Sequence, residues 1–193
     1  MKTPTILIGV VFILTLVHGA VFDKLSFLFL PLGDPSAAIA GDDPHSPFVG
    51  PALSLLETRT YNYGGEGHIS PTLRGPSYPI ALAAAFLLFG KYIGSFVFLN
   101  FVFFASSVIF LWLMSKRLIV GKWAILPPLA LALFWEPASL VWLPSYEAFS
   151  LFLVTGAFYG LLRSHEHATW LVFSGALFGI LIFLGSVIFG FDL

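Results

Sequence analysis

The chain has 193 residues, of which 58% are hydrophobic and 17% aromatic, while only 10% are charged. Soluble domains carry about 25% charged residues, so this composition, with a mean hydropathy of +0.94, excludes an ordinary water-soluble domain and a disordered chain. A net charge of -1 offers no basic surface for nucleic acid. The absence of cysteine excludes disulfides, Cys-ligated metal sites and a thiol nucleophile. The composition predicts an all-α integral membrane protein that crosses the bilayer several times.

The first apolar segment, residues 6–22, follows a single Lys2 and is long enough to span a bilayer. A secretory signal peptide has a similar pattern, and small residues near Gly19 would suit its cleavage. We favour an uncleaved first span over a signal peptide at residues 1–20.

Residues 23–92 form a segment of different character, punctuated by Pro, Gly, Asp and Ser. A connection of about 70 residues is unusual unless it has a function. We expect two short helices on the membrane surface within it, near 47–58 and 79–90. The second contains an apolar run of only about 11 residues, or about 17 Å as a helix, which is too short to cross.

The remaining apolar segments predict four further spans in one transmembrane domain that covers residues 1–193. These spans are expected at 93–114, 123–142, 147–163 and 169–189.

Basic residues indicate the orientation, because cytoplasmic loops are enriched in Lys and Arg. With the amino terminus in the cytoplasm and 79–90 not crossing, the inner segments hold Lys2, Lys116, Arg117, Lys122 and Arg163. We therefore expect a plasma-membrane protein with about five spans and one long outer loop.

Asp42 and Asp43 stand in that outer loop, just before the first predicted surface helix. A carboxylate in this position has the chemistry to accept a proton from an acceptor hydroxyl or to bind a divalent cation. The structural alternative is a solvated turn with Pro44.

Arg74 begins the motif Arg74-Gly75-Pro76-Ser77-Tyr78-Pro79, which leads into the second surface helix. A guanidinium at headgroup depth has the geometry to bind a phosphate with two hydrogen bonds. Arg74 and Tyr78 are therefore candidate substrate-binding residues, and the alternative is an ordinary interfacial anchor.

Two acidic residues flank the outer end of the third predicted span. Glu136 is the deeper of the two, where an ionisable group is costly and usually faces a polar cavity or marks a kink. Glu147 lies nearer the surface, where it is either part of a site or simply solvated.

The triplet His165-Glu166-His167 has potential metal ligands, but alternate residues do not share a helix face. We do not expect it to bind a metal. His45 and His68, in the outer loop, are only weakly better candidates.

The order of these features resembles the polytopic GT-C glycosyltransferases, the protein-mannosyltransferase and aminoarabinose-transferase-like group. That pattern reads roughly Asp-x3-Tyr-x3-Ala-x2-Leu, then Arg-Pro-Pro-x-Tyr-Pro, then an acidic site. Residues 74–79 carry the most specific match, followed by Tyr146-Glu147-Ala148-Phe149. The sequence departs from the pattern at Phe48, where Tyr is usual, and at Gly75, where Pro is usual.

The resemblance implies transfer of a sugar from a polyprenyl-phosphate donor to a glycan, lipid or protein acceptor on the outer face. It implies that Asp42 or Asp43 is the general base, that Arg74 stabilises the leaving phosphate, and that Glu147 completes the acidic site. A divalent metal ion is a possible cofactor.

The resemblance extends over the front half of a typical family member, so we expect an incomplete enzyme with little activity alone. A missing carboxy-terminal part or a homo-oligomer would supply the remaining helices. The alternative function is a non-catalytic multi-pass scaffold or a transporter-like protein, in which Glu136 would matter and the outer acids would not.

Overall fold

A computed structural model describes residues 2–22, 24–32, 48–61, 75–134 and 139–185. Over these ranges the chain is helical and forms no strand, apart from an isolated antiparallel bridge between Pro31 and Tyr92. The predicted all-helical fold class is therefore confirmed for the part of the chain that the structure describes.

The elements follow one another with short connections in the second half of the chain. They are α1 (Lys2–Val21), η1 (Leu25–Phe29), α2 (Val49–Glu57), α3 (Ser77–Phe89), α4 (Ile93–Leu118), η4 (Gly121–Ile125), α5 (Leu126–Leu133), α7 (Glu147–Arg163) and α8 (Ala168–Gly185).

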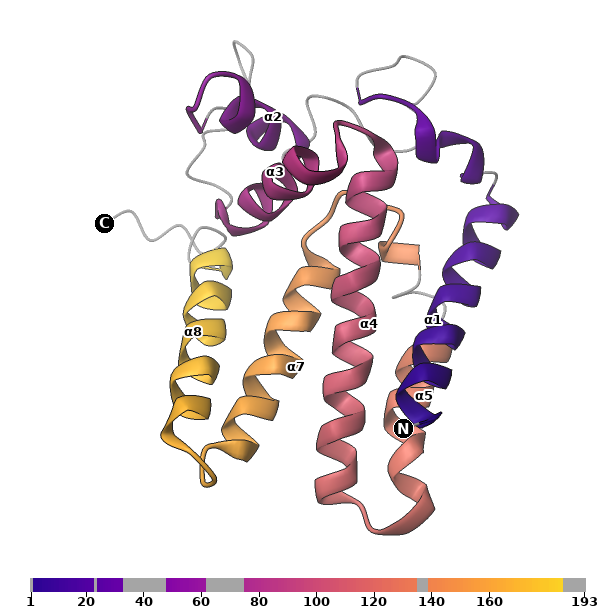
Figure 1. Ribbon diagram of the computed structural model, residues 1–193, viewed down its shortest axis with the longest axis vertical. Helices are drawn as coiled ribbons and strands as arrows, with labels where there is room; N and C mark the ends of the chain where they lie inside the picture. Colours follow the sequence, from indigo (N-terminus) through magenta and orange to yellow (C-terminus); the bar gives the residue numbers. More distant parts are fainter. Residues whose placement is uncertain (1, 23, 33–47, 62–74, 135–138, 186–193) are drawn as a thin grey trace.

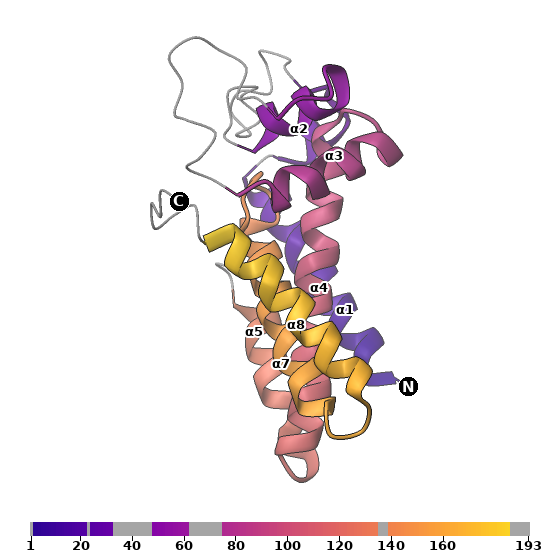
Figure 2. The same ribbon diagram turned by 90° about the vertical axis from the view of Figure 1, so that its left-hand side faces the viewer.

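The helices form a bundle capped at one end (Figure 1). Helices α1, α4, α5, α7 and α8 run along the long axis, and α2 and α3 lie across the end at which α4 and α7 begin. The view turned by 90° shows the same separation between bundle and cap (Figure 2). Successive bundle helices alternate in direction, so that the amino terminus, the α4–η4 connection and the α7–α8 turn share the opposite end.

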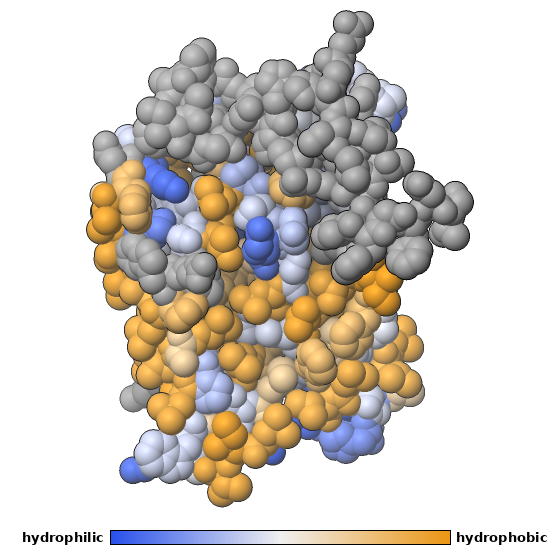
Figure 3. Space-filling model, turned by 180° about the vertical axis from the view of Figure 1, so that it is seen from behind, coloured by the Kyte–Doolittle hydropathy of each residue, from blue (hydrophilic) through white to orange (hydrophobic). Residues whose placement is uncertain are grey.

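Among the described residues, two helices have both the length and the hydropathy of a membrane span. They are α1, over Thr3–Val21, and α4, with 26 residues and a mean hydropathy of 2.3. The apolar helices Ser77–Phe89, Gly121–Leu133 and Ala168–Phe183 are shorter. Seen from behind, apolar side chains dominate the face along the bundle, and hydrophilic ones lie mainly toward its ends (Figure 3).

The start and the end of helix α3 are explained by the prolines and the glycine that stand there. Helix α3 has Pro76 at its N-cap and Pro79 in its first turn, where a missing N–H costs nothing. It ends at Gly90, whose φ of 89° is costly for other residues. Its 13 residues span about 20 Å, well short of a bilayer core of about 30 Å.

The segment 123–142, expected as one span, is not one continuous helix. Helix α5 ends at Leu133, and Phe134 is extended with a ψ of 119°. The sequence supplies a reason, since Pro137 has no N–H to donate to the carbonyl of Leu133, four residues earlier, which is where the helix ends. By contrast, α7 occupies the predicted range 147–163 without change.

Small residues bring α7 and α8 together. A Cβ added at Gly160 would lie 3.1 Å from the Trp170 carbonyl oxygen and 3.0 Å from Ser174 Cβ. The Ser174 hydroxyl donates a hydrogen bond to the Ala157 carbonyl at 2.8 Å, again between the two helices. Close approach at small residues and hydrogen bonds between helices are typical of membrane helix pairs.

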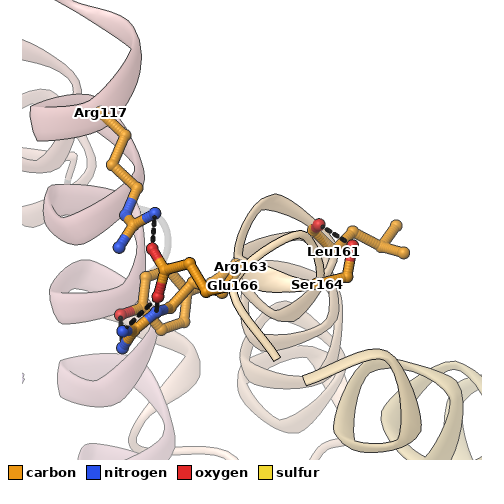
Figure 4. A network of polar contacts seen from close by, with 6 residues as sticks. Arg117, Leu161, Arg163, Ser164 and Glu166 are labelled. Carbon is orange, nitrogen blue, oxygen red and sulfur yellow. Dashed lines mark hydrogen bonds and ion pairs between the residues drawn. The ribbon is translucent and has the colours of Figure 1, made fainter. Parts of the chain in front are cut away.

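An ion network joins α4 to the α7–α8 turn (Figure 4). Glu166 accepts from Arg117 Nη1 at 2.6 Å through one oxygen and from Arg163 Nε at 2.7 Å through the other. Hydrogen bonds from Arg117 and then Arg163 lower the pKa of Glu166. The guanidinium of Arg163 also lies 4.5 Å from the centre of the Trp170 ring. These contacts fix the end of the bundle that carries the amino terminus.

Candidate functional site

Side chains from four parts of the chain meet where the cap joins the bundle. We call this group the Tyr78 cluster and define it as Phe48, Tyr78, Asn100, Tyr146 and Phe149. Phe48 precedes α2, Tyr78 opens α3, Asn100 lies in α4, and Tyr146 and Phe149 stand at the start of α7.

Tyr78 is fully buried, with an exposed fraction of 0%. Its hydroxyl donates a hydrogen bond to Asn100 Oδ1 at 2.9 Å. Burial raises the pKa of Tyr78, and the negative charge of Glu147 raises it further. The phenol is therefore neutral, and it acts as a fixed hydrogen-bond donor between α3 and α4.

Asn100 uses both ends of its amide. While Oδ1 accepts from Tyr78, Nδ2 donates to the Leu143 carbonyl at 2.7 Å. The side chain is completely buried, where an unpaired amide would be costly. Asn100 thus links Tyr78 of the cap to the segment around Leu143, which precedes α7.

Aromatic rings complete the junction. Phe48 contacts Tyr78 edge to face, with ring centres 5.3 Å apart, and contacts Tyr146 at 5.6 Å. Tyr78 also contacts Phe149 at 6.0 Å. Since offset and edge-to-face ring pairs stabilise packing beyond the area they bury, these contacts hold the starts of α2, α3 and α7 at one place.

Glu147 lies at the edge of this cluster. It is exposed and occupies the first turn of α7, where the helix dipole favours a negative charge. Beside it, the hydroxyl oxygen of Ser145 is buried and has no hydrogen-bond partner among the described residues. A buried polar atom without a partner is uncommon, so this edge of the cluster has spare hydrogen-bonding capacity.

Of the site residues predicted from the sequence, the structure describes Tyr78 and Glu147 and brings them into one neighbourhood. Asp42, Asp43 and Arg74 lie outside the described residues. The other polar candidates of the outer segments, Glu136, His45 and His68, also lie outside them.

The His165-Glu166-His167 triplet has a structural role at its centre, because Glu166 is bound by Arg117 and Arg163. No group of three or more His, Cys, Asp or Glu side chains with the geometry of a metal site occurs in the described ranges.

Asn100 is the residue of this cluster that the sequence analysis missed. The available signal was an amide within the apolar run 93–114. Polar side chains in such segments are expensive and usually have a specific partner, so an isolated Asn there merited a place among the candidates.

Searches against protein-family models, curated proteins and solved structures give no match for this chain.

Proposed function

We propose that the chain crosses a membrane about five times, through α1, α4, the α5 region, α7 and α8, with α2 and α3 on the outer surface. Alternating helix directions support this topology. Lys116, Arg117, Lys122 and Arg163 all belong to helix ends on the side of the amino terminus. The ammonium of Lys116 lies 4.8 Å from the Trp112 ring centre, a pairing suited to a membrane interface.

We further propose that the cap end carries a site for sugar transfer from a polyprenyl-phosphate donor. The observation that carries this proposal is the Tyr78 cluster, which joins three segments implicated by the sequence. Phe48 follows Asp42 and Asp43, Tyr78 follows Arg74, and Tyr146 precedes Glu147. The class of donor comes from the resemblance to GT-C enzymes.

Chain length limits how far the unplaced groups lie from the cluster. A fully extended chain spans about 3.3–3.6 Å per residue, so Asp43 is within about 18 Å of Phe48 and Arg74 within about 14 Å of Tyr78. Ring contacts of 5–6 Å already join Phe48, Tyr78 and Tyr146. A site shared by Arg74, an aspartate and Glu147 is therefore compatible with covalent geometry.

In the proposed reaction, Asp42 or Asp43 removes a proton from the acceptor hydroxyl. The acceptor oxygen forms a bond to the anomeric carbon of the sugar, and the bond from that carbon to the phosphate oxygen breaks. The polyprenyl phosphate leaves with the electron pair, and Arg74 stabilises its negative charge. Tyr78, whose hydroxyl is already bonded to Asn100, acts as a positioning residue for the Arg74 segment.

Binding of a radiolabelled polyprenyl-phosphate sugar to the purified chain in detergent tests the proposal. We expect Arg74→Gln to weaken binding about 10-fold or more, because a charge-assisted hydrogen bond contributes about 1.5–3 kcal/mol. Arg59→Gln is the matched control, since Arg59 is an exposed arginine at the end of the α2 segment, and it should bind normally.

Turnover separates the catalytic role from donor binding. If the chain transfers sugar, replacing Asp42 and Asp43 together by Asn should abolish the rate while donor binding persists, because Asn keeps the shape but is no base. A wild-type chain that binds no donor would contradict the proposal and favour the non-catalytic scaffold. Turnover that survives the double substitution would contradict the assignment of the base.

A further inference from the structure

The connection from α4 to η4 mixes positive and apolar side chains at the end of the bundle opposite the cap (Figure 1). Residues 116–123, which we call the basic turn, read Lys-Arg-Leu-Ile-Val-Gly-Lys-Trp. Three of its apolar side chains are open to the surroundings, with exposed fractions of 63% for Leu118, 92% for Val120 and 59% for Trp123. Large apolar side chains interleaved with cations fit a boundary between water and an apolar phase.

The basic turn carries positive charge that the protein does not neutralise. Lys116 and Lys122 are exposed, and neither forms an ion pair with a residue that the structure describes. Neither Asp nor Glu occurs anywhere between Glu66 and Glu136 in the sequence. The turn is therefore complementary to a negatively charged surface.

The nearest carboxylate is already occupied. Glu166, from the α7–α8 turn, accepts from Arg117 and Arg163 (Figure 4). One carboxylate bound by two guanidinium groups leaves this end of the bundle with an excess of positive charge. The arginines thus serve the internal network, and the two lysines remain for a partner outside the protein.

Each of these lysines lies over a tryptophan ring. Lys116 Nζ is 4.8 Å from the centre of the Trp112 ring, and Lys122 Nζ is 5.6 Å from that of Trp123. Tryptophan is enriched where membranes meet water, since its ring is apolar and its N–H is polar. An ammonium over such a ring keeps N–H donors for a phosphate. The two pairs combine apolar surface and positive charge at one level.

The length of α4 places the basic turn at headgroup depth. Its 26 residues extend about 39 Å, compared with about 30 Å for the hydrocarbon of a bilayer and about 40–45 Å with the headgroups. Lys116 stands two residues before the end of the helix. If α4 spans a bilayer, as in the topology proposed above, its last turn reaches the phosphates of one leaflet.

We propose that the basic turn binds anionic phospholipid headgroups, with Lys116 and Lys122 at the lipid phosphates and Val120 among the adjoining acyl chains. The positive charge favours anionic lipids over zwitterionic ones, whose own ammonium cancels the phosphate charge. The open apolar side chains favour a lipid surface over an acidic protein in water. This inference rests on the proposed membrane topology and is independent of sugar transfer, because it uses no residue of the Tyr78 cluster.

Fluorescence quenching at position 120 tests the proposal, because the chain has no cysteine of its own. The whole chain with Val120→Cys carries one nitrobenzoxadiazole probe in vesicles of phosphatidylcholine and phosphatidylglycerol. Either lipid carries a nitroxide near the start of an acyl chain. Phosphatidylglycerol should quench at least about 3-fold more than phosphatidylcholine, since each lysine near an anionic surface strengthens attraction about 5-fold. The preference should weaken as salt is raised.

Substitution of the lysines tests the residues themselves. Lys116→Gln together with Lys122→Gln should bring the quenching ratio of the two lipids to about one. Arg59→Gln together with Lys91→Gln is the matched control, because it removes two exposed positive charges at the cap end, and it should keep the ratio. A wild-type ratio of one, or a preference that survives the double lysine substitution, would overturn the proposal.

A second probe position separates this proposal from the topology. Val102 lies in the middle part of α4 and is 39% exposed, so a probe at Val102→Cys reports whether α4 is in the bilayer. Quenching at position 102 without lipid preference at 120, or without any quenching at 120, would overturn the basic turn as a lipid site alone. No quenching at either position would contradict the topology and this proposal together.

Discussion

At the scale of single residues, Tyr78 and Asn100 show how buried polar groups specify a tertiary structure. Each needs the other, because the Tyr78 hydroxyl and Asn100 Oδ1 are both removed from water. In an apolar environment an unmatched group costs more than the matched pair contributes. The pair therefore favours one relative position of α3 and α4 over alternatives that bury a similar apolar area.

Tyr78→Phe should lower the free energy of unfolding by about 1–3 kcal/mol, because Asn100 Oδ1 loses its donor. Equilibrium unfolding in mixed micelles with a rising SDS fraction measures this change. Tyr92→Phe is a suitable control, since Tyr92 is 46% exposed, and it should change stability by less than about 0.5 kcal/mol. Equal effects of the two substitutions would contradict the role assigned to the Tyr78–Asn100 pair.

The same pair gives stability a pH dependence. The pKa of Tyr78 is raised in the folded protein above the ordinary value of 10.0. The unfolded chain therefore releases this proton first as the pH rises. The contribution of Tyr78 is fully present below about pH 10 and is lost as the pH rises above it. Unfolding measured from pH 8 to 11 should show this loss in the wild type, and a smaller loss in Tyr78→Phe.

At the scale of elements, the glycines of α7 and α8 differ in how closely neighbouring helices approach them. Gly156 and Gly160 of α7 face α4 and α8 so closely that an added Cβ would meet Leu177 Cδ1 at 2.8 Å or the Trp170 carbonyl at 3.1 Å. Gly175 of α8 faces open space, with nothing within 4 Å. The same residue type thus has a packing role in one helix and none among the described contacts of the other.

We expect Gly160→Ala to destabilise the protein by about 1–3 kcal/mol, because the added methyl group would lie 3.0 Å from the side chains of Phe173 and Ser174 and 3.1 Å from the Trp170 carbonyl oxygen, closer than ordinary van der Waals contact. Gly175→Ala should leave stability unchanged or raise it by up to about 1 kcal/mol, since Ala is the better helix former. The SDS titration described above compares the two variants. A Gly160→Ala protein as stable as Gly175→Ala would show that the α7–α8 spacing is not fixed by Gly160.

At the scale of the whole molecule, the distribution of charge agrees with the direction of the helices. The ends of α4 and α7 bring Arg117 and Arg163 together through Glu166, at the end of the bundle where α1 begins. The cap lies at the other end, where Lys91 pairs with Glu57 at 2.6 Å on the surface. A membrane normal along the bundle axis would place these two ends in opposite compartments.

Cysteine labelling tests this topology directly, because the chain has no cysteine of its own. Gly65→Cys, in the proposed outer loop, should react with an impermeant maleimide in intact cells. Leu118→Cys, at the end of α4 and 63% exposed, should react only after permeabilisation. Labelling of position 118 in intact cells would reverse the proposed orientation or require α3 to cross.

The sequence by itself determined the all-helical fold class and the positions of the main helices that the structure describes. Long apolar runs favour helices in any arrangement, since the backbone must satisfy its own hydrogen bonds away from water. Helix α4 begins where the sequence predicts, at Ile93, and continues to Leu118, four residues beyond the predicted end at 114, while α7 covers 147–163. The brevity of α3 follows from the prolines at its start and from Gly90 at its end. These features depend on residues that are close together along the chain, so they can be predicted from the sequence alone.

Only the tertiary structure decided which of these segments meet. Nothing local to Phe48, Asn100 or Tyr146 indicates that they converge on Tyr78, because contacts between distant residues depend on how whole helices pack. An apolar cavity of about 560 Å³, lined by Phe12 and Leu16 of α1 and Phe98 of α4 among others, is likewise invisible in the sequence, since these side chains look like those of any apolar helix. Periodicity and composition report the environment of a segment, whereas a site is formed by the partners that the fold brings to it.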